Sequence, residues 1–246
     1  MSDPKLQRGA LPIGGRKADS QQTTLNTQLL PMDQQLLFLI NREWTSAPLD
    51  LFMAAISCLD AWMPIIVASG LAMAIWGNFR LRAFLAAALI VVGINDGLIS
   101  HSLKRLVDRP RPHQSHNDVR QVDLAKATPR ALALFKPVKV KLSRTTLHDV
   151  DGRSFPSSHT MNTISAALVA VCFFGRRASW AMLLAALIAY SRIYTGAHWP
   201  TDVVTSVFLG LGTTLLWLML LEWLWRRHAG QLLPRLHSQH PSLLAA

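Results

Sequence analysis

The chain has 246 residues, of which 50% are hydrophobic and 16% are charged, and its formal net charge is +11. The apolar residues gather in long continuous blocks, whereas the helices of a soluble protein carry an apolar stripe along one side. This pattern argues against an ordinary soluble domain and predicts an integral membrane protein.

The N-terminal region is polar and lacks the apolar core of a secretory signal. Residues 1–33 are therefore predicted to be a disordered tail. The segment that follows, residues 34–44, is too short to span a bilayer, which takes about 20 residues. We expect it to form a short helix on the membrane surface or against the bundle.

Five apolar blocks follow, and each is expected to cross the bilayer. In chain order they run over Leu51–Trp76, Ala83–Leu103, Ser158–Phe174, Ala178–Ile193 and Asp202–Trp225. Segments this apolar satisfy their backbone groups only as helices. We therefore predict an all-α fold, a polytopic transmembrane helical bundle over residues 34–228. A long basic connection at 105–153 lies within it, and residues 229–246 form a C-terminal tail.

The short connections indicate how the bundle is oriented. Arginines occupy the turn after the first helix, the turn after the third and the end of the fifth: Arg80, Arg82, Arg176, Arg177, Arg226 and Arg227. Short arginine-rich loops stay in the cytoplasm. We therefore expect the opposite helix ends to face outward, which for the expected location in a bacterial inner membrane is the periplasmic side. One observation opposes this orientation, because Lys104–Arg153, on the side predicted to be external, holds 12 Lys or Arg against 5 Asp.

Three basic side chains lie at the outward ends of the predicted helices. Lys104 and Arg111 flank the end of the second helix, where two prolines stop it, and Arg192 follows at the end of the fourth. A lysine point charge and planar arginine forks together suit phosphate oxygens. Taken singly, each residue is more often only an anchor at the membrane interface.

The stretch RSFPSSH, residues 153–159, places two serines and a histidine where Pro156 starts the third helix. Ser157 and Ser158 are candidate helix caps. The free N–H groups at the start of a helix also bind anions. We expect both serines to bind phosphate, with His159 beside them.

His198 and Asp202 are four residues apart at the start of the fifth helix, on either side of Pro200. This spacing can put both on one face, so that the carboxylate orients one ring nitrogen and the other nitrogen attacks. His159 then acts as an acid for the leaving oxygen. Such a pair is weak evidence alone. The convergence of three polar segments at one membrane face favours a site that handles phosphate.

Three motifs in these segments resemble the signatures of the type 2 phosphatidic acid phosphatase superfamily, which includes lipid phosphatases, bacterial acid phosphatases and vanadium haloperoxidases. They are K-x6-RP over Lys104–Pro112, PSSH over Pro156–His159, and SR-x5-H-x3-D over Ser191–Asp202. One departure is Ser158, where the family usually has glycine. Another is the N-terminus, where the usual first spanning helix is missing or reduced to residues 34–44. Arg109 lies outside the motif spacing, so we expect it to contribute less than Arg111.

The resemblance implies a mechanism. His198 attacks phosphorus and becomes a phosphohistidine while Asp202 holds its ring, and His159 protonates the leaving oxygen. The residues implied to bind phosphate are Lys104, Arg111, Ser157, Ser158 and Arg192. We expect a metal-independent phosphatase with no cofactor, because the sequence shows no cluster of metal ligands near these motifs and its cations already suit the phosphate charge.

The expected substrate is a phosphate or diphosphate on a lipid of the surrounding bilayer. Candidates are a prenyl diphosphate, phosphatidate, phosphatidylglycerophosphate and a lipid A phosphate. No nucleic-acid partner is expected, and the sequence leaves the oligomeric state open. A lipid phosphotransferase that uses the same site is an alternative. A vanadate-dependent haloperoxidase and a non-enzymatic phospholipid-binding membrane protein are weaker alternatives.

Asp60, Asp96 and His101 lie inside the predicted spans, where ionisable groups are candidates for function. A structural role is favoured for them. Asp96 and its neighbour Asn95 are placed to form hydrogen bonds between helices, and His101 lies one turn before the basic end of the second helix.

Overall fold

A short helix precedes the bundle in the computed structural model, which describes residues 31–144 and 153–244. Residues 31–38 are helical and continue into a π-helical turn, η1 (Leu39–Glu43). The short N-terminal helix predicted for residues 34–44 is therefore present. It also includes residues 31–33, which the sequence assigned to the tail, because Asp33 is held against the bundle. The rest of the predicted tail lies outside the described residues.

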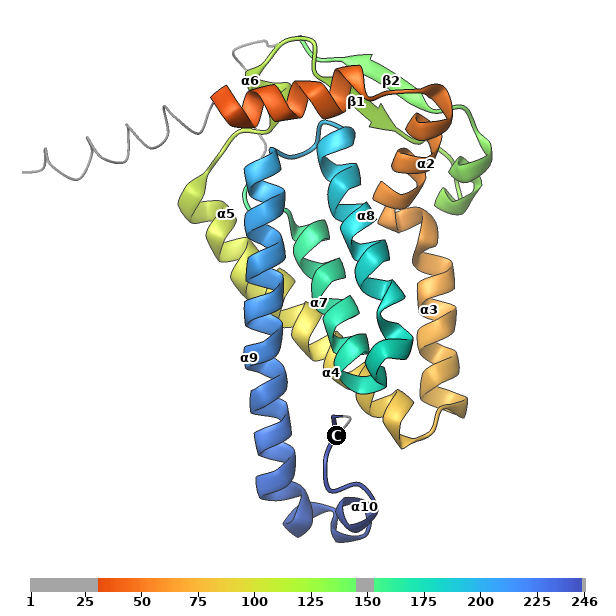
Figure 1. Cartoon of the computed structure of the whole chain (residues 1–246). Helices are drawn as coiled ribbons and strands as arrows, with labels where there is room; N and C mark the ends of the chain where they lie inside the picture. The colour runs from red at the N-terminus through yellow and green to blue at the C-terminus, as the bar shows by residue number, and fades with distance from the viewer. Residues whose placement is uncertain (1–30, 145–152, 245–246) are drawn as a thin grey trace, which may run out of the picture.

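Two helices replace the first predicted span. They are α2 (Ala47–Ser57) and α3 (Leu59–Trp76). The break lies at Cys58, whose φ of −91° and ψ of 82° are not helical. Because of this break, α2 stays at one end of the bundle, where Ser57 contacts Arg192, while α3 runs along the outside of the bundle (Figure 1).

The second predicted span is part of a longer helical rod. The rod consists of α4 (Phe79–Ile94), the π-helical segment η2 (Asn95–Ser100) and α5 (His101–Val107). It ends at Asp108, which has a left-handed backbone with φ of 43°. The chain therefore leaves the helix directly before the prolines of the first motif.

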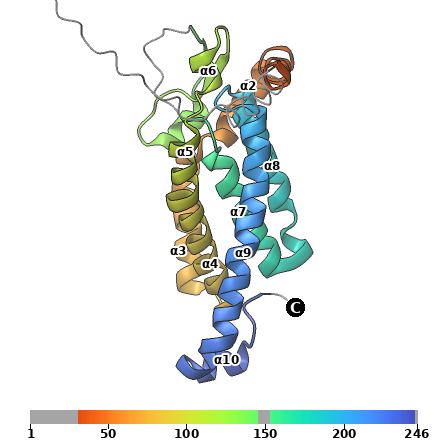
Figure 2. The same cartoon turned by 90° about the vertical axis from the view of Figure 1, so that its left-hand side faces the viewer.

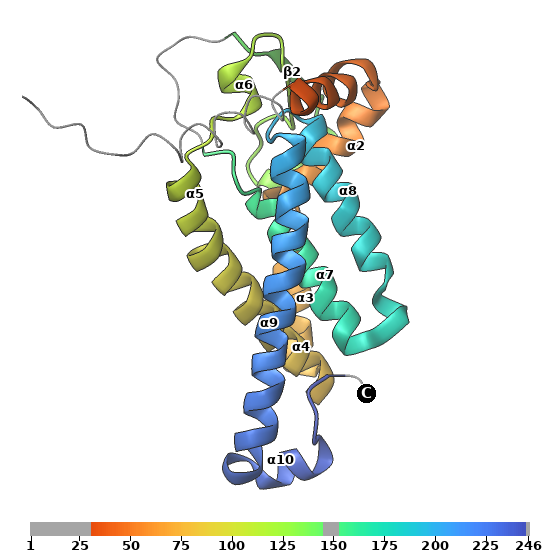
Figure 3. The same cartoon turned by 60° about the vertical axis from the view of Figure 1, so that its left-hand side comes forward.

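The centre of the bundle is α7 (Ser158–Phe174), which starts and ends at the predicted residues. It packs against α4, α8 (Trp180–Tyr194) and α9 (Pro200–Leu232) (Figure 3). A 3-10 turn, η4 (Gly175–Ala178), joins α7 to α8. The helix α9 extends beyond both ends of the predicted Asp202–Trp225 span.

Within the described residues, four helical stretches are long and apolar enough to cross a membrane. They are Leu59–Trp76, Phe79–Val107, Ser158–Ala178 and Pro200–Leu232. We predicted five spans, and the remaining one corresponds to α8, which has only 15 residues. Even so, α8 runs beside α7 from η4 back toward the opposite end of the bundle (Figure 1). The predicted all-α membrane bundle is thus confirmed, with a shorter fourth helix.

The long connection between α5 and α7 folds over one end of the bundle (Figure 2). Its described elements are α6 (Pro112–Ser115), β1 (Arg120–Asp123), the 3-10 helix η3 (Arg130–Phe135) and β2 (Lys139–Leu142). The strands are antiparallel, with Val122 opposite Val140. This small sheet was not predicted. The Asn41 side chain binds both backbone groups of Arg120 in this sheet. Its Nδ2 donates to Arg120 O at 2.9 Å, and its Oδ1 accepts from Arg120 N–H at 2.8 Å.

The turn between α8 and α9 packs directly against this sheet. Gly196 in the turn has φ of 71°, and a Cβ at this position would lie 2.5 Å from the carbonyl oxygen of Arg120. The neighbouring Thr195 carbonyl accepts a hydrogen bond from Val122 N–H at 3.4 Å. A residue with a side chain would force the turn and the sheet apart, so glycine fits the close approach.

The C-terminal segment folds back onto the other end of the bundle. After α9 comes α10 (Pro234–Gln239), and the chain then returns along α9 (Figure 1). The Glu222 carboxylate accepts from Ser242 Oγ at 2.7 Å and from Leu243 N–H at 2.9 Å. The region that we predicted to be a C-terminal tail from residue 229 therefore contains helix and is anchored to α9.

Candidate active site

Three segments that are distant in sequence meet at the end of the bundle beneath the β1–β2 sheet. The end of α5 and the loop after it supply Lys104 and Arg111. The first turn of α7 supplies His159, and the end of α8 with its turn supplies Arg192 and His198. The charges of both arginines act on both histidines. The predicted cations and histidines therefore form one cluster.

Lys104 is bound to the start of α7. Its Nζ donates to Ser158 Oγ at 2.6 Å, and the same hydroxyl is 2.7 Å from Ser100 Oγ. The serine that stands where the family usually has glycine thus contacts a motif lysine. As the first residues of α7, Ser158 and His159 have backbone N–H groups without an intrahelical partner, which is the arrangement that binds anions.

Ser157 has a structural contact that the sequence did not reveal. It is completely buried, and its N–H donates to Ser206 Oγ in α9 at 2.8 Å. Its own Oγ accepts from Thr160 Oγ1 at 3.0 Å. The Ser157 amide is therefore engaged with α9 and is not presented to a phosphate, contrary to the expectation for the amides at this helix start.

Arg111 and Arg192 each bury an N–H donor. Among the described residues, the Nε atoms of both guanidinium groups are inaccessible to solvent and have no hydrogen-bond partner. The Nη1 of Arg192 does have partners, since it donates to Ser57 Oγ at 2.5 Å and to the Ser57 carbonyl oxygen at 3.3 Å. Burial lowers the pKa of Arg111 from its ordinary value. Buried donors without a partner cost about 1–3 kcal/mol each, and an anion that accepts from them would remove this cost.

His198 is held in one tautomer. Its side chain is buried, and Nδ1 lies 2.7 Å from the carbonyl oxygen of Ser154. A carbonyl oxygen can only accept, so Nδ1 carries the proton and the lone pair is on Nε2. Burial, with the nearby charges of Arg192 and Arg111, lowers the pKa of His198 well below that of an ordinary histidine. The ring is thus a neutral base, and within the described part of the chain its Nε2 has no hydrogen-bond partner.

The Asp202 carboxylate does not bind the His198 ring directly, which corrects the predicted contact. Its Oδ1 accepts from Arg109 Nη1 at 2.6 Å, and its Oδ2 accepts from Ser154 Oγ at 2.5 Å. Ser154 therefore stands between the acid and the ring. The predicted contact relied on helical spacing, but α9 starts only at Pro200, so His198 lies in the preceding turn and not on the same helix face.

His159 lies in the first turn of α7, half-buried beside the cations. The charges of Arg192, Lys104 and Arg111 all act on its imidazole. Asp60, at the start of α3, also acts on it and supplies the opposite charge. The imidazole is therefore part of the cluster of cations that the sequence predicts to bind phosphate.

The sequence did not indicate Ser154 or the link of Asp60 to His159. Arg109 was expected to contribute less than Arg111, and its contact with Asp202 was not predicted. Ser154 belongs to the RSFPSSH stretch, but a serine in a loop has no spacing signal of its own. Among the other polar residues, Asn95 forms the predicted bond between helices, since its Nδ2 donates to Ser165 Oγ at 2.9 Å. Asp96 and His101 are both exposed.

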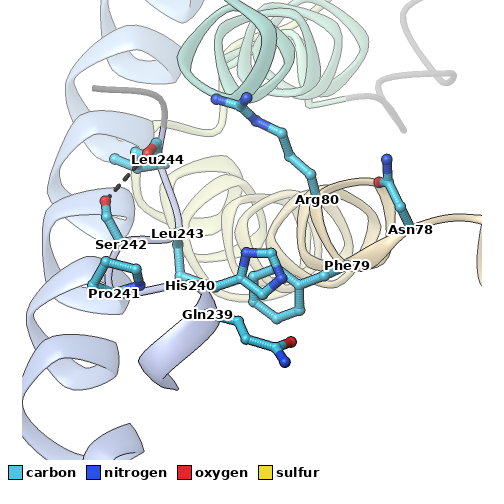
Figure 4. Close-up of a pocket in the computed structure, with 9 residues that line it drawn as sticks. All are labelled: Asn78, Phe79, Arg80, Gln239, His240, Pro241, Ser242, Leu243 and Leu244. Atoms are coloured by element: carbon cyan, nitrogen blue, oxygen red, sulfur yellow. Dashed lines mark hydrogen bonds between the residues drawn. The ribbon is translucent and has the colours of Figure 1, made fainter. Parts of the chain in front are cut away.

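The described residues hold no group of three or more His, Cys, Asp or Glu side chains arranged to bind a metal ion. A cavity of about 460 Å³ lies at the far end of the bundle, between the α3–α4 turn and the C-terminal segment (Figure 4). One wall of it is the His240 ring stacked on Phe79, with centroids 4.1 Å apart. None of the predicted site residues lines this cavity.

Two relatives and one solved structure resemble the chain over different lengths. The lipid A 4'-phosphatase of Bacteroides thetaiotaomicron is 26% identical over 195 residues, which cover 74% of this chain and 73% of that protein. The undecaprenyl-diphosphatase of Sulfolobus acidocaldarius is 36% identical over 59 residues, which cover 23% of this chain and 28% of that protein. The crystal structure of Aquifex aeolicus LpxE has a TM-score of 0.54 and 23% identity, covering 76% of this chain and 95% of that one, and shows a shared fold.

A family model described as the PAP2 superfamily matches residues 81–226. The match covers more than half of the chain and contains all three motifs together with the cluster of cations and histidines. The helical layout agrees with it, because the motifs lie at helix ends on one side of a membrane bundle. The chain therefore belongs to the PAP2 superfamily and is an integral-membrane phosphatase.

Proposed function

We propose that the chain removes a phosphate group from a phosphorylated lipid through a phosphohistidine on His198. The observation that supports this most is the pair of buried, unpartnered Nε–H donors of Arg111 and Arg192, whose charges act on a histidine with a free Nε2. Donors for an anion and an attacking nitrogen are thus found in one cluster. This combination suits phosphoryl transfer better than passive binding of a headgroup.

In the first step, the lone pair on His198 Nε2 attacks phosphorus and forms an N–P bond. The bond from phosphorus to the lipid oxygen breaks, and His159 gives its proton to that oxygen. Lys104, Arg111 and Arg192 bind the equatorial oxygens, where negative charge accumulates in the transition state. The N–H groups at the start of α7 add to this binding.

In the second step, water attacks the phosphohistidine. The His159 ring, now neutral, takes a proton from the water, and the N–P bond breaks to release inorganic phosphate. Both histidines return to their starting states. No metal ion takes part in either step, because the cations supply the positive charge that the transition state requires.

The substrate is proposed to be a lipid phosphate in the outer leaflet of the bilayer. The site lies at the end of the bundle opposite the short arginine-rich turns, which favour the cytoplasm. The relative named lipid A 4'-phosphatase matches most of the chain, whereas the undecaprenyl-diphosphatase matches about a quarter of it. A lipid A type phosphate is therefore the first substrate to test, followed by a prenyl diphosphate.

The test is phosphate release by purified protein from lipid A, undecaprenyl diphosphate, phosphatidylglycerophosphate and phosphatidate, each with and without excess EDTA. We expect release from at least one lipid, unchanged by EDTA and blocked by vanadate, which mimics pentacoordinate phosphorus. The control is His198→Ala, which should release none. Activity that EDTA abolishes and Mg²⁺ restores would contradict the mechanism, and no release from any lipid would contradict the proposed substrate class.

A further inference from the structure

Asp33 is 3% exposed, although it lies in the N-terminal region far from the three motifs. Its Oδ1 accepts from Thr201 N–H at 2.9 Å, and its Oδ2 accepts from Thr201 Oγ1 at 2.6 Å. Thr201 is the second residue of α9, so the carboxylate satisfies a free N–H group and meets the positive end of the helix dipole. The helical segment at residues 31–38 is thereby attached to the start of α9.

Arg109 joins Asp33 to the predicted site. Its Nη2 binds Asp33 Oδ2 at 2.6 Å, and its Nη1 binds Asp202 Oδ1 at 2.6 Å. The planar fork of a guanidinium can bridge two carboxylates, which the single ammonium of a lysine cannot do in the same geometry. The Arg109 backbone takes part as well, because its carbonyl oxygen accepts from Ser154 N–H at 2.7 Å.

The network ends on the His198 ring. Ser154 donates through Oγ to Asp202 Oδ2, and its carbonyl oxygen receives the Nδ1–H of His198. Arg109 thus fixes Ser154 in two ways, directly through its own carbonyl and indirectly through Asp202. A continuous hydrogen-bonded chain thus connects Asp33 to the His198 ring.

We propose that Asp33 and Arg109 are positioning residues that hold His198 in line for attack by fixing Asp202 and Ser154. The proposal rests on the proposed phosphohistidine mechanism and adds to it two residues that the motifs do not specify. Neither side chain contacts the phosphate-binding cations by a hydrogen bond or ion pair within the described residues. Losing either one should therefore slow the chemical step and leave substrate binding intact.

A second buried ion pair provides a matched control. Asp50 is 8% exposed, accepts from Arg120 Nη2 at 2.7 Å and accepts from Tyr194 OH at 2.6 Å. It attaches α2 to the sheet and to α8 at the same end of the bundle. It forms no hydrogen bond with the network that holds His198. Asp50→Asn therefore measures the general effect of losing a buried ion pair in this region.

The experiment compares kcat and KM of the purified full-length wild type with those of Asp33→Asn, Arg109→Lys, the double variant and Asp50→Asn. A misplacement of about 1 Å caused by a mutation far from the chemistry can cost about 100-fold, so we expect kcat to fall at least about tenfold in each single variant. KM should stay within about twofold of the wild-type value. Because both residues act through one network, the double variant should be no slower than the slower single variant. Asp50→Asn should keep kcat within about twofold, even where its thermal stability falls.

Wild-type kcat in Asp33→Asn, an equal loss in Asp50→Asn, or losses that multiply in the double variant would each overturn the proposal. If Asp33→Asn does not purify as a monodisperse protein, Asp33→Glu replaces it under the same criteria, because it keeps the charge but displaces the carboxylate by one methylene. Rapid quenching of the wild type separates this result from the underlying mechanism. Absence of phosphoenzyme would contradict the phosphohistidine mechanism, while the ratios of kcat would still decide the role of Asp33.

Discussion

Arg111 and Arg192 hold the strongest residue-level evidence for an anion site, because each has a buried donor without a partner in the described chain. Buried donors without a partner are rare in folded proteins, and a bound anion is one arrangement that would satisfy these two. The fork of Arg111 can bind two oxygens of a phosphate at once, whereas a lysine at this position would bind as a point charge. The arginine geometry is therefore expected to matter as well as its charge.

Arg111→Lys should lower kcat/KM about 30-fold or more, which corresponds to a loss of about 2 kcal/mol in transition-state stabilisation, the scale for losing one oxyanion donor. The measurement is steady-state kinetics on the preferred lipid. Arg105→Lys, an exposed position on α5, is the matched control and should have little effect. Equal losses at the two positions would show that a general loss of arginine, and not this fork, causes the effect.

The sequence predicted which residues gather here, but not how they are connected. Lys104, Arg111 and His198 could be identified because their spacing matches a motif. The link from Asp202 to the ring was wrong, because the ring lies in a turn where helical spacing does not apply. Asp33 could not be predicted, since its contact with Thr201 spans 168 positions in sequence and no local pattern reports such a distance.

At the scale of elements, the close packing of α7 on α9 sets the position of the site. Gly210 lies at this contact, where an added Cβ would be 2.9 Å from the Met161 carbonyl oxygen. One turn earlier, Ser206 accepts the hydrogen bond from Ser157 N–H at the start of α7. A change in the distance between these helices would therefore move the first turn of α7, which bears His159.

Gly210→Ala should destabilise the protein, because the overpacked methyl group costs about 1–3 kcal/mol. Gly212→Ala is the control, since a Cβ there meets nothing within 4 Å and alanine gains about 1 kcal/mol in helix propensity. Thermal unfolding in detergent should show a lower Tm for the first variant and an unchanged or higher Tm for the second. The same Tm shift in both would argue against close packing at Gly210.

Element boundaries were predicted where composition changes sharply. The helix α7 matched its prediction because Pro156 and Gly175 bound an apolar run. The break at Cys58 was missed, because residues on both sides of it are apolar and composition does not change there. The β1–β2 pair was also missed, since each strand has only four residues and depends on contacts with Asn41 and the α8–α9 turn.

At the scale of the whole molecule, the arginines of the short connections and the candidate active site lie at opposite ends of the bundle. The start of α4, which holds Arg80, and η4, which holds Arg176, lie at one end of the bundle, and the sheet with the cluster of cations and histidines lies at the other (Figure 1). Short basic turns stay in the cytoplasm, so the cluster is proposed to face outward. The substrate pool would then be the outer leaflet.

Cysteine labelling tests this orientation. In a background with Cys58→Ala and Cys172→Ala, we expect Leu142→Cys in β2 to react with an impermeant maleimide in intact cells. Ser179→Cys, at the α7–α8 turn, should react only after the membrane is permeabilised. Both positions are exposed on the protein, so access across the membrane decides the result. The opposite labelling pattern would place the site in the cytoplasm.

In the proposed mechanism, His198 becomes phosphorylated and His159 only transfers protons. Rapid quenching with p-nitrophenyl phosphate, whose leaving group needs little protonation, tests this directly. We predict acid-labile phosphoenzyme in the wild type and in His159→Ala, and none in His198→Ala. Phosphoenzyme in His198→Ala together with its absence in His159→Ala would contradict this mechanism and exchange the roles of the two histidines.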